Sequence, residues 1–128
     1  MKKPTGLLLI TVFALVYAVG AIAGPTELSR NDAEKLIKGN TAEGTNIWGR
    51  KMIWYFDEFG KLKKRDDRGQ KGKAAWRLDE KGRLCYQDKH MTEERCERII
   101  PKEGGRYEVR FEAQWKWEKV VPGNPHNL

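Results

Sequence analysis

Cysteine, histidine and serine are scarce in this chain of 128 residues, which limits the chemistry available to it. There are two cysteines and two histidines, and no C-x-x-C or H-x-x-x-H spacing indicates a zinc site. Ser29 is the only serine, and no G-x-S-x-G, P-loop or dinucleotide-binding motif occurs. We therefore predict no metal site, no cofactor and no catalytic residue.

The few residues that could carry chemistry have simpler explanations. A zinc site built from both cysteines and His90 requires this histidine to fold back between them, and a haem ligand at His90–Met91 falls in a predicted loop tip. Adjacent acids such as Asp66–Asp67 lie in polar, turn-like stretches, where carboxylates are normally solvated. An enzyme that uses loop acids as acid and base is the weakest interpretation.

The longest apolar run lies at the start of the chain. Lys2 and Lys3 precede uncharged residues 6–19, and Ala21-Ile22-Ala23 has the small-x-small pattern of a signal-peptidase site. We predict a signal peptide over 1–23, cleaved near Ala23, and one domain over 24–128 that is periplasmic or secreted. An uncleaved membrane anchor is the alternative, because residues 7–23 reach the lower length limit for crossing a bilayer.

Export would place Cys85 and Cys96 in an oxidising compartment, where the pair is predicted to form a disulfide. The bridge closes a loop of about 12 residues and stabilises the fold by about 3 kcal/mol in the chain-entropy model. A domain of this size has a modest core and gains from such a covalent link.

The hydrophobic pattern predicts a mainly β domain, an antiparallel meander or small barrel with one N-terminal α-helix. Residues 28–39 form the helix, with Ser29 as its N-cap and Gly39 at its end. From there the apolar period changes to two, as in antiparallel strands. Residues 107–118 alternate without interruption and predict one long strand, bent or bulged near Ala113. The other predicted strands cover 41–44, 51–56, 61–65, 73–78, 83–87 and 95–100.

One turn sequence occurs twice. Asp57-Glu58-Phe59-Gly60 and Asp79-Glu80-Lys81-Gly82 each begin with Asp, end with Gly and are followed by a basic residue and a leucine. Asp in the first position and Gly in the fourth favour a type I turn followed by a left-handed residue. We predict two hairpins with this connection, and a calcium loop is disfavoured because the alternating acids of an EF-hand are missing.

The chain contains several short motifs, namely Gly39-Asn40-Thr41-x-x-Gly44, Tyr55-Phe56-Asp57-x-x-Gly60, Trp76, Gly82-x-Leu84-Cys85, Cys96 and Gly123-Asn124-Pro125-x-x-Leu128. These motifs resemble a group of small exported bacterial domains of unknown function, the DUF995-like proteins. The resemblance covers nearly the whole predicted mature chain and implies, by analogy, a lipocalin-like β meander. This chain is more basic over 61–73 than that pattern, so the resemblance supplies no ligand.

Positive charge is concentrated in residues 61–73, which account for the whole excess of the predicted mature chain. This stretch predicts contact with an anionic envelope component, such as lipopolysaccharide or phospholipid headgroups, or with an acidic protein. The alternative is a solvated edge strand whose lysines prevent aggregation. The lack of a nucleic-acid-binding motif, together with export, argues against nucleic acid as a partner. The candidate residues are Lys61, Lys63, Lys64, Arg65, Arg68, Lys71 and Lys73.

The five tryptophans suggest a second kind of site. Small barrels can enclose one small apolar ligand in a cavity lined by aromatic rings. We predict Trp48, Trp54 and Trp117 as candidate ligand-binding residues, and we expect Trp76 and Trp115 to fill the core. The alternative is that all five serve as core volume.

Together these features predict an exported binding or envelope accessory protein that acts noncovalently. The alternative is an inhibitor or immunity factor that acts on another exported protein. A ligand-binding barrel should enclose an apolar cavity of about a few hundred Å³, whereas an inhibitor should have a filled interior and an exposed aromatic or charged protrusion.

Overall fold

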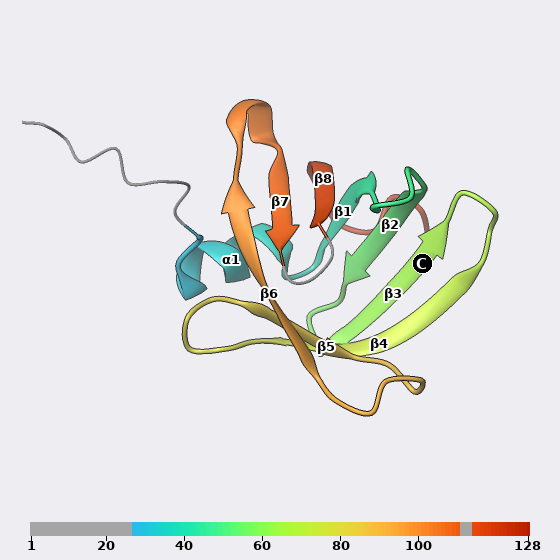
Figure 1. Cartoon of the computed structure of the whole chain (residues 1–128), viewed down its shortest axis with the longest axis horizontal. Coiled ribbons are helices and arrows are strands. Elements are labelled where there is room, and N and C mark those ends of the chain that lie inside the picture. The colour runs from blue at the N-terminus through green and yellow to red at the C-terminus, as the bar shows by residue number, and fades with distance from the viewer. Residues whose placement is uncertain (1–26, 111–113) are drawn as a thin grey trace, which may run out of the picture.

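Eight antiparallel strands close into a barrel in the computed structural model, which describes residues 27–110 and 114–128 (Figure 1). Each strand pairs with the next, and β8 pairs with β1. The predicted fold class, mainly β with one α-helix and a single disulfide, is confirmed. The elements are α1 (Arg30–Ile37), β1 (Asn40–Thr45), β2 (Lys51–Phe56), β3 (Lys61–Asp66), β4 (Lys71–Leu78), β5 (Leu84–Gln87), β6 (Arg95–Pro101), the 3-10 helix η1 (Glu103–Gly105), β7 (Tyr107–Arg110) and β8 (Gln114–Pro122).

The predicted signal peptide lies outside the described residues and stays a prediction. Within residues 27–110 and 114–128, no helix has the length and apolar character needed to cross a bilayer.

Four hairpins share one turn, of which the sequence predicted two. In each turn the first side chain, Asn46, Asp57, Asp66 or Asp79, accepts hydrogen bonds from the N–H groups of the third and fifth residues. The fourth residue is always a glycine with φ between 74° and 88°, a backbone conformation that disfavours other residues. The turn therefore depends on its first and fourth residues and leaves the second and third free to vary.

Helix α1 covers the barrel end at which β1 begins and β2 ends (Figure 1). Ser29 accepts the Asp32 N–H at 3.2 Å, as predicted, and Asn40 donates to the Leu36 carbonyl at 2.8 Å beyond the last turn. Ala33 and Ile37 are fully buried in the barrel core. Because successive strands run antiparallel, the loops β1–β2, β3–β4 and β5–β6 lie at the opposite end, which we call the loop end.

The predicted single strand over 107–118 is wrong, because the chain reverses between β7 and β8. The two strands pair antiparallel, with Tyr107 opposite Trp117 and Val109 opposite Trp115. This register pairs odd-numbered residues with odd-numbered residues, so the same side chains share one face whether the chain continues or turns back. The expected bend at Ala113 falls on residues outside the described ranges.

Aromatic rings fill the barrel. Trp54 is 1% exposed, and its ring centroid lies 4.2 Å from that of Trp115, 5.8 Å from that of Tyr86 and 6.2 Å from that of Trp117. The space left beside Trp54, Trp115 and Trp117 has a volume of about 10 Å³. This is no more than one water molecule occupies.

Candidate functional site

The outer face of the β3–β4 hairpin carries a dense group of cations. Leu62 and Ala74 are buried, and side chains alternate along a strand, so the odd-numbered residues of both strands point outward. Five of the seven predicted cations therefore gather on this face, namely Lys61, Lys63, Arg65, Lys71 and Lys73.

Like charges face each other across this hairpin. The strand register places Lys63 directly opposite Lys73, and Arg65 directly opposite Lys71. Directly opposed like charges destabilise a sheet, so the packing of the fold does not account for the arrangement. The edge-strand interpretation is wrong for β3, which pairs with both β2 and β4. Lys71 and Lys73 lie in the first half of β4, which pairs with β3 but not with β5.

A cleft of about 760 Å³ separates the β3–β4 hairpin from the β5–β6 loop. That loop contributes Lys89 and His90, which face the lysines of the hairpin across the cleft. An adjoining hollow of about 500 Å³ shares part of this lining and extends to Lys61. We call the two together the basic cleft. Its basic residues are Lys61, Lys63, Lys64, Lys71, Lys73, Lys89 and His90.

The acidic groups in the basic cleft are already engaged. Asp88 lies 3.8 Å from the Lys64 ammonium and accepts the His90 N–H, while Asp57 accepts two N–H groups of its own turn. Among the described residues, four of the lysines have no ion-pair partner, and they are Lys61, Lys71, Lys73 and Lys89. The cleft thus presents positive charge that the folded chain leaves largely uncompensated.

The last two residues of the segment 123–128, Asn127 and Leu128, line one side of the basic cleft. Thr41 donates to the Gly123 carbonyl at 2.7 Å, and His126 hydrogen-bonds the Glu43 carboxylate, so this segment is fixed across the outer face of β1. Lys63 then donates to the Leu128 carbonyl at 3.3 Å. Burial acts to raise the pKa of Glu43, but His126 and Lys119 lower it below its ordinary value.

Two of the predicted cations do not lie on the outer face of the β3–β4 hairpin. Lys64 lies two residues after buried Leu62 in β3, so its side chain also points inward. Its Nζ lies 6.0 Å from the centroid of the Trp54 ring, and its Cε lies beside Gly72. Arg68 is exposed at the tip of the β3–β4 turn. Lys64 lines the basic cleft from within, whereas Arg68 belongs to the loop end.

A buried polar pair occupies the barrel near Lys64. Glu97 is 3% exposed and accepts the Tyr86 hydroxyl at 2.9 Å, while its Oε2 and the Trp54 Nε1 have no partner among the described residues. Burial raises the pKa of Glu97 to about 7, although Tyr86, Arg95 and Lys64 act in the opposite direction. Burial and the neighbouring Glu97 charge also raise the pKa of the Tyr86 hydroxyl. Glu97 and Ile99 lie two residues apart in β6, so their side chains point to the same face of the strand. This alternation was the sequence signal for the inward position of Glu97.

The structure does not bring the three candidate tryptophans together around a cavity. Trp54 and Trp117 are buried in the core, 1% and 3% exposed, whereas Trp48 is 77% exposed in the β1–β2 turn. Trp115, expected in the core, is half-buried against Trp54. The described interior therefore favours core volume as the role of Trp54 and Trp117.

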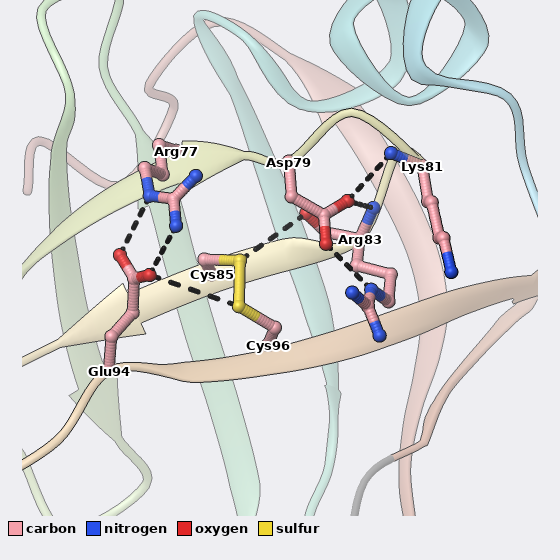
Figure 2. A network of polar contacts seen from close by, with 7 residues as sticks. All are labelled: Arg77, Asp79, Lys81, Arg83, Cys85, Glu94 and Cys96. Atoms are coloured by element: carbon pink, nitrogen blue, oxygen red, sulfur yellow. Dashed lines mark hydrogen bonds and ion pairs between the residues drawn. A yellow bond between two sulfur atoms is a disulfide. The ribbon is translucent and has the colours of Figure 1, made fainter.

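The Cys85–Cys96 disulfide links two residues directly opposite each other in β5 and β6 (Figure 2). Arg77 binds Glu94 on one side of the bridge, and Asp79 binds Arg83 on the other. Asp79 and the two sulfur atoms lie within 4.8 Å of one another, which is close enough for metal ligands. The sulfurs are bonded to each other, and both Asp79 oxygens accept hydrogen bonds, so the folded, oxidised chain offers no open ligand set there.

Sequence reasoning missed Lys89 and His90 as cleft residues because they belong to a loop that lies beside the β3–β4 hairpin only through the pairing of β5 with β4. Comparisons with family models, with curated proteins and with solved structures gave no match to this chain. The DUF995-like resemblance therefore stays a prediction.

Proposed function

We propose that this protein is an exported, noncovalent binding protein that holds an anionic component of the cell envelope in its basic cleft. The observation that carries the proposal is the set of unpaired lysines around one cleft, with two like-charged pairs held directly opposite each other. Such a concentration of one charge in a concave site raises the local concentration of an oppositely charged ligand. Phosphate groups fit this site best, because ammonium groups bind them as point charges without a fixed geometry.

The proposal does not include a small apolar ligand inside the barrel. Among the described residues, the space beside Trp54, Trp115 and Trp117 holds only about 10 Å³. An enclosed ligand would require a cavity of about 300 Å³ or more. The proposal includes binding but no catalysis, because Lys64 and backbone N–H groups already engage the acids of the basic cleft.

Titration of the purified protein with inorganic tripolyphosphate tests the proposal. Wild-type protein should bind with an affinity that falls steeply with salt, and the variant Lys63→Gln/Lys73→Gln/Lys89→Gln should bind about tenfold or more weakly. The control Lys35→Gln/Lys38→Gln/Lys81→Gln removes the same charge from α1 and the β4–β5 turn, away from the cleft. Equal losses in both variants would show attraction by net charge alone and overturn the proposal.

A second candidate is an inhibitor of another exported protein. The filled interior and the exposed Trp48 and Phe59 side chains, 77% and 90% exposed, are the features that distinguish it from a ligand-enclosing barrel. Native mass spectrometry of the protein isolated from the periplasm tests it. A stoichiometric protein partner that is lost in Trp48→Ser or Phe59→Ser supports this candidate, and a monomer carrying only a small anion supports the first.

A further inference from the structure

Two adjacent apolar side chains project into solvent from the β1–β2 turn at the loop end of the barrel. Ile47 is 51% exposed and Trp48 is 77% exposed. Within the described part of the chain, the only other large apolar side chain that is comparably exposed is Phe59, which lies at the opposite end in the β2–β3 turn. The pair forms a single apolar tip, which we call the Ile47–Trp48 tip.

The turn backbone holds this tip outward. Asn46 Oδ1 accepts the Trp48 N–H at 3.0 Å and the Arg50 N–H at 2.9 Å, and the Asn46 carbonyl accepts the Gly49 N–H at 3.0 Å. Gly49 has a φ of 74°, and a side chain added there would meet nothing within 4 Å. The tip is therefore a defined feature of the surface, fixed by Asn46 and Gly49 and not by contacts of its own side chains.

The three sister turns show that folding does not require apolar residues at these positions. They share the hydrogen bonds and the left-handed glycine of the β1–β2 turn. The corresponding pairs are Asp67–Arg68 and Glu80–Lys81 in two of them, and Glu58–Phe59 in the third. Only the β1–β2 turn carries two apolar residues. A role outside the fold accounts for this difference.

Cations outnumber acids beside the tip. Arg50 and Lys51 follow Gly49, and the neighbouring β3–β4 turn adds Arg68 together with Asp66 and Asp67, because the Asp67 N–H bonds the Lys51 carbonyl at 3.1 Å. Asp66 lies 3.6 Å from the Arg50 guanidinium and is thereby partly neutralised. In the described ranges, neither Lys51 nor Arg68 has an ion-pair partner. The basic cleft opens at this same end, between the start of β4 and the β5–β6 loop.

We propose that the loop end of the barrel docks on an anionic phospholipid bilayer, with the Ile47–Trp48 tip inserted among the headgroups. An indole ring is well suited to this depth, because its apolar body enters the acyl boundary while its N–H stays in the polar region. A single apolar anchor binds membranes only marginally, and a basic patch provides the second signal that makes binding stable. The inference rests on the proposed function, because the basic cleft supplies this electrostatic attraction.

Vesicle sedimentation tests the inference. The probe is phosphatidylcholine containing about one-third phosphatidylglycerol, at about 0.1 M salt, with pure phosphatidylcholine as the uncharged comparison. We expect Trp48→Ser to lower the partition coefficient about tenfold, since the transfer of one large apolar side chain is lost. Phe59→Ser is the matched control, because it removes a more exposed aromatic ring from the opposite end, and its binding should equal that of the wild type.

A depth measurement separates insertion from simple attraction. Phosphatidylcholine brominated on its acyl chains should quench part of the wild-type tryptophan fluorescence in mixed vesicles, and this component should vanish in Trp48→Phe. Wild-type partitioning of Trp48→Ser, or quenching that persists in Trp48→Phe, overturns the inference. If tripolyphosphate binding is intact in that case, the proposed function stands and only membrane docking fails. Loss of a protein partner in Trp48→Ser without loss of vesicle binding also overturns it.

Discussion

Lys63 and Lys73 lie directly opposite each other on the outer face of the β3–β4 hairpin, and neither has an acidic side chain as partner among the described residues. Such a pair lowers the stability of the sheet. We expect Lys73→Glu to raise the free energy of unfolding by about 0.5 kcal/mol, because it converts a repulsive cross-strand pair into an attractive one. The same change should weaken tripolyphosphate binding at least as much as Lys73→Gln.

Urea denaturation and tripolyphosphate titration of the same two variants check this prediction. A gain in stability together with a loss of binding is the expected signature. If Lys73→Glu binds tripolyphosphate as the wild type does, the opposed lysines do not belong to the site.

The inward carboxyl of Glu97 predicts an unusual pH dependence of stability. Burial raises its folded-state pKa from 4.5 to about 7, so between these values the folded chain retains a proton that the unfolded chain has released. The contribution to stability is therefore fully present below pH 4.5 and is lost as the pH rises through 7. A shift of this size corresponds to about 3 kcal/mol.

Glu97→Gln should remove this dependence, because the amide stays neutral and can still accept the Tyr86 hydroxyl. We expect the variant to match the wild type near pH 4.5 and to be more stable above pH 7, as measured by urea denaturation across this range. The groups that face Glu97 are Tyr86 from β5, Arg95 from β6 and Lys64 from β3, and none of them is a carboxyl. The other carboxyls therefore titrate alike in both proteins, and their contribution cancels when the variant is compared with the wild type. Parallel pH profiles for the two proteins would contradict the prediction.

The disulfide should make a large contribution to stability for so small a barrel. Replacement of Cys85 and Cys96 by alanine opens a loop of about 12 residues and should lower the free energy of unfolding by about 3 kcal/mol. The β5–β6 backbone pairing and the Arg77–Glu94 pair, which joins β4 to the residue before β6, do not depend on the bridge, so the β5–β6 hairpin should retain its register. Denaturation of the wild type with and without reductant measures the effect. Reductant should not change the stability of the double variant, which has no disulfide.

The alternation of side chains along a strand, together with local turn and cap chemistry, explains which predictions from the sequence were right and which were wrong. Ser29 as N-cap, the two Asp-x-x-Gly turns and the cysteine pairing depend on local chemistry, and the structure confirms all of them. The reversal after Arg110 was missed because Tyr107 and Trp117 share a face in either arrangement. Only the length of the pattern, about twice that of an ordinary strand, indicated two strands.

The candidate site was predictable only in part, for a related reason. The alternation that buries Leu62 also turns Lys64 inward, so parity could have separated it from the outward Lys63. The approach of Lys89 to the same cleft depends on how the β5–β6 loop leaves the β4–β5 pair, and no local pattern encodes it. The exposure of Trp48 and the burial of Trp54 follow from turn and strand positions, since the first lies in an Asn-x-x-Gly turn and the second shares a strand face with Phe56.

Gly44 of β1 lies close to the backbone of β8, at the register shift between Glu43 and Gly44. A side chain added there would clash with the Lys116 carbonyl oxygen, a backbone atom that cannot move without disturbing the barrel seam. Gly44→Ala should therefore lower the free energy of unfolding by about 3 kcal/mol or more, as overpacking does at well-packed sites. Gly72→Ala is the control, because its new methyl group would meet only the flexible Lys64 side chain, with Cε at 3.3 Å. Urea denaturation should show a large loss for the first variant and a change within about 0.5 kcal/mol for the second. Equal stabilities of the two would mean that β1 and β8 do not meet as the structure places them, and the barrel would then be open at this seam.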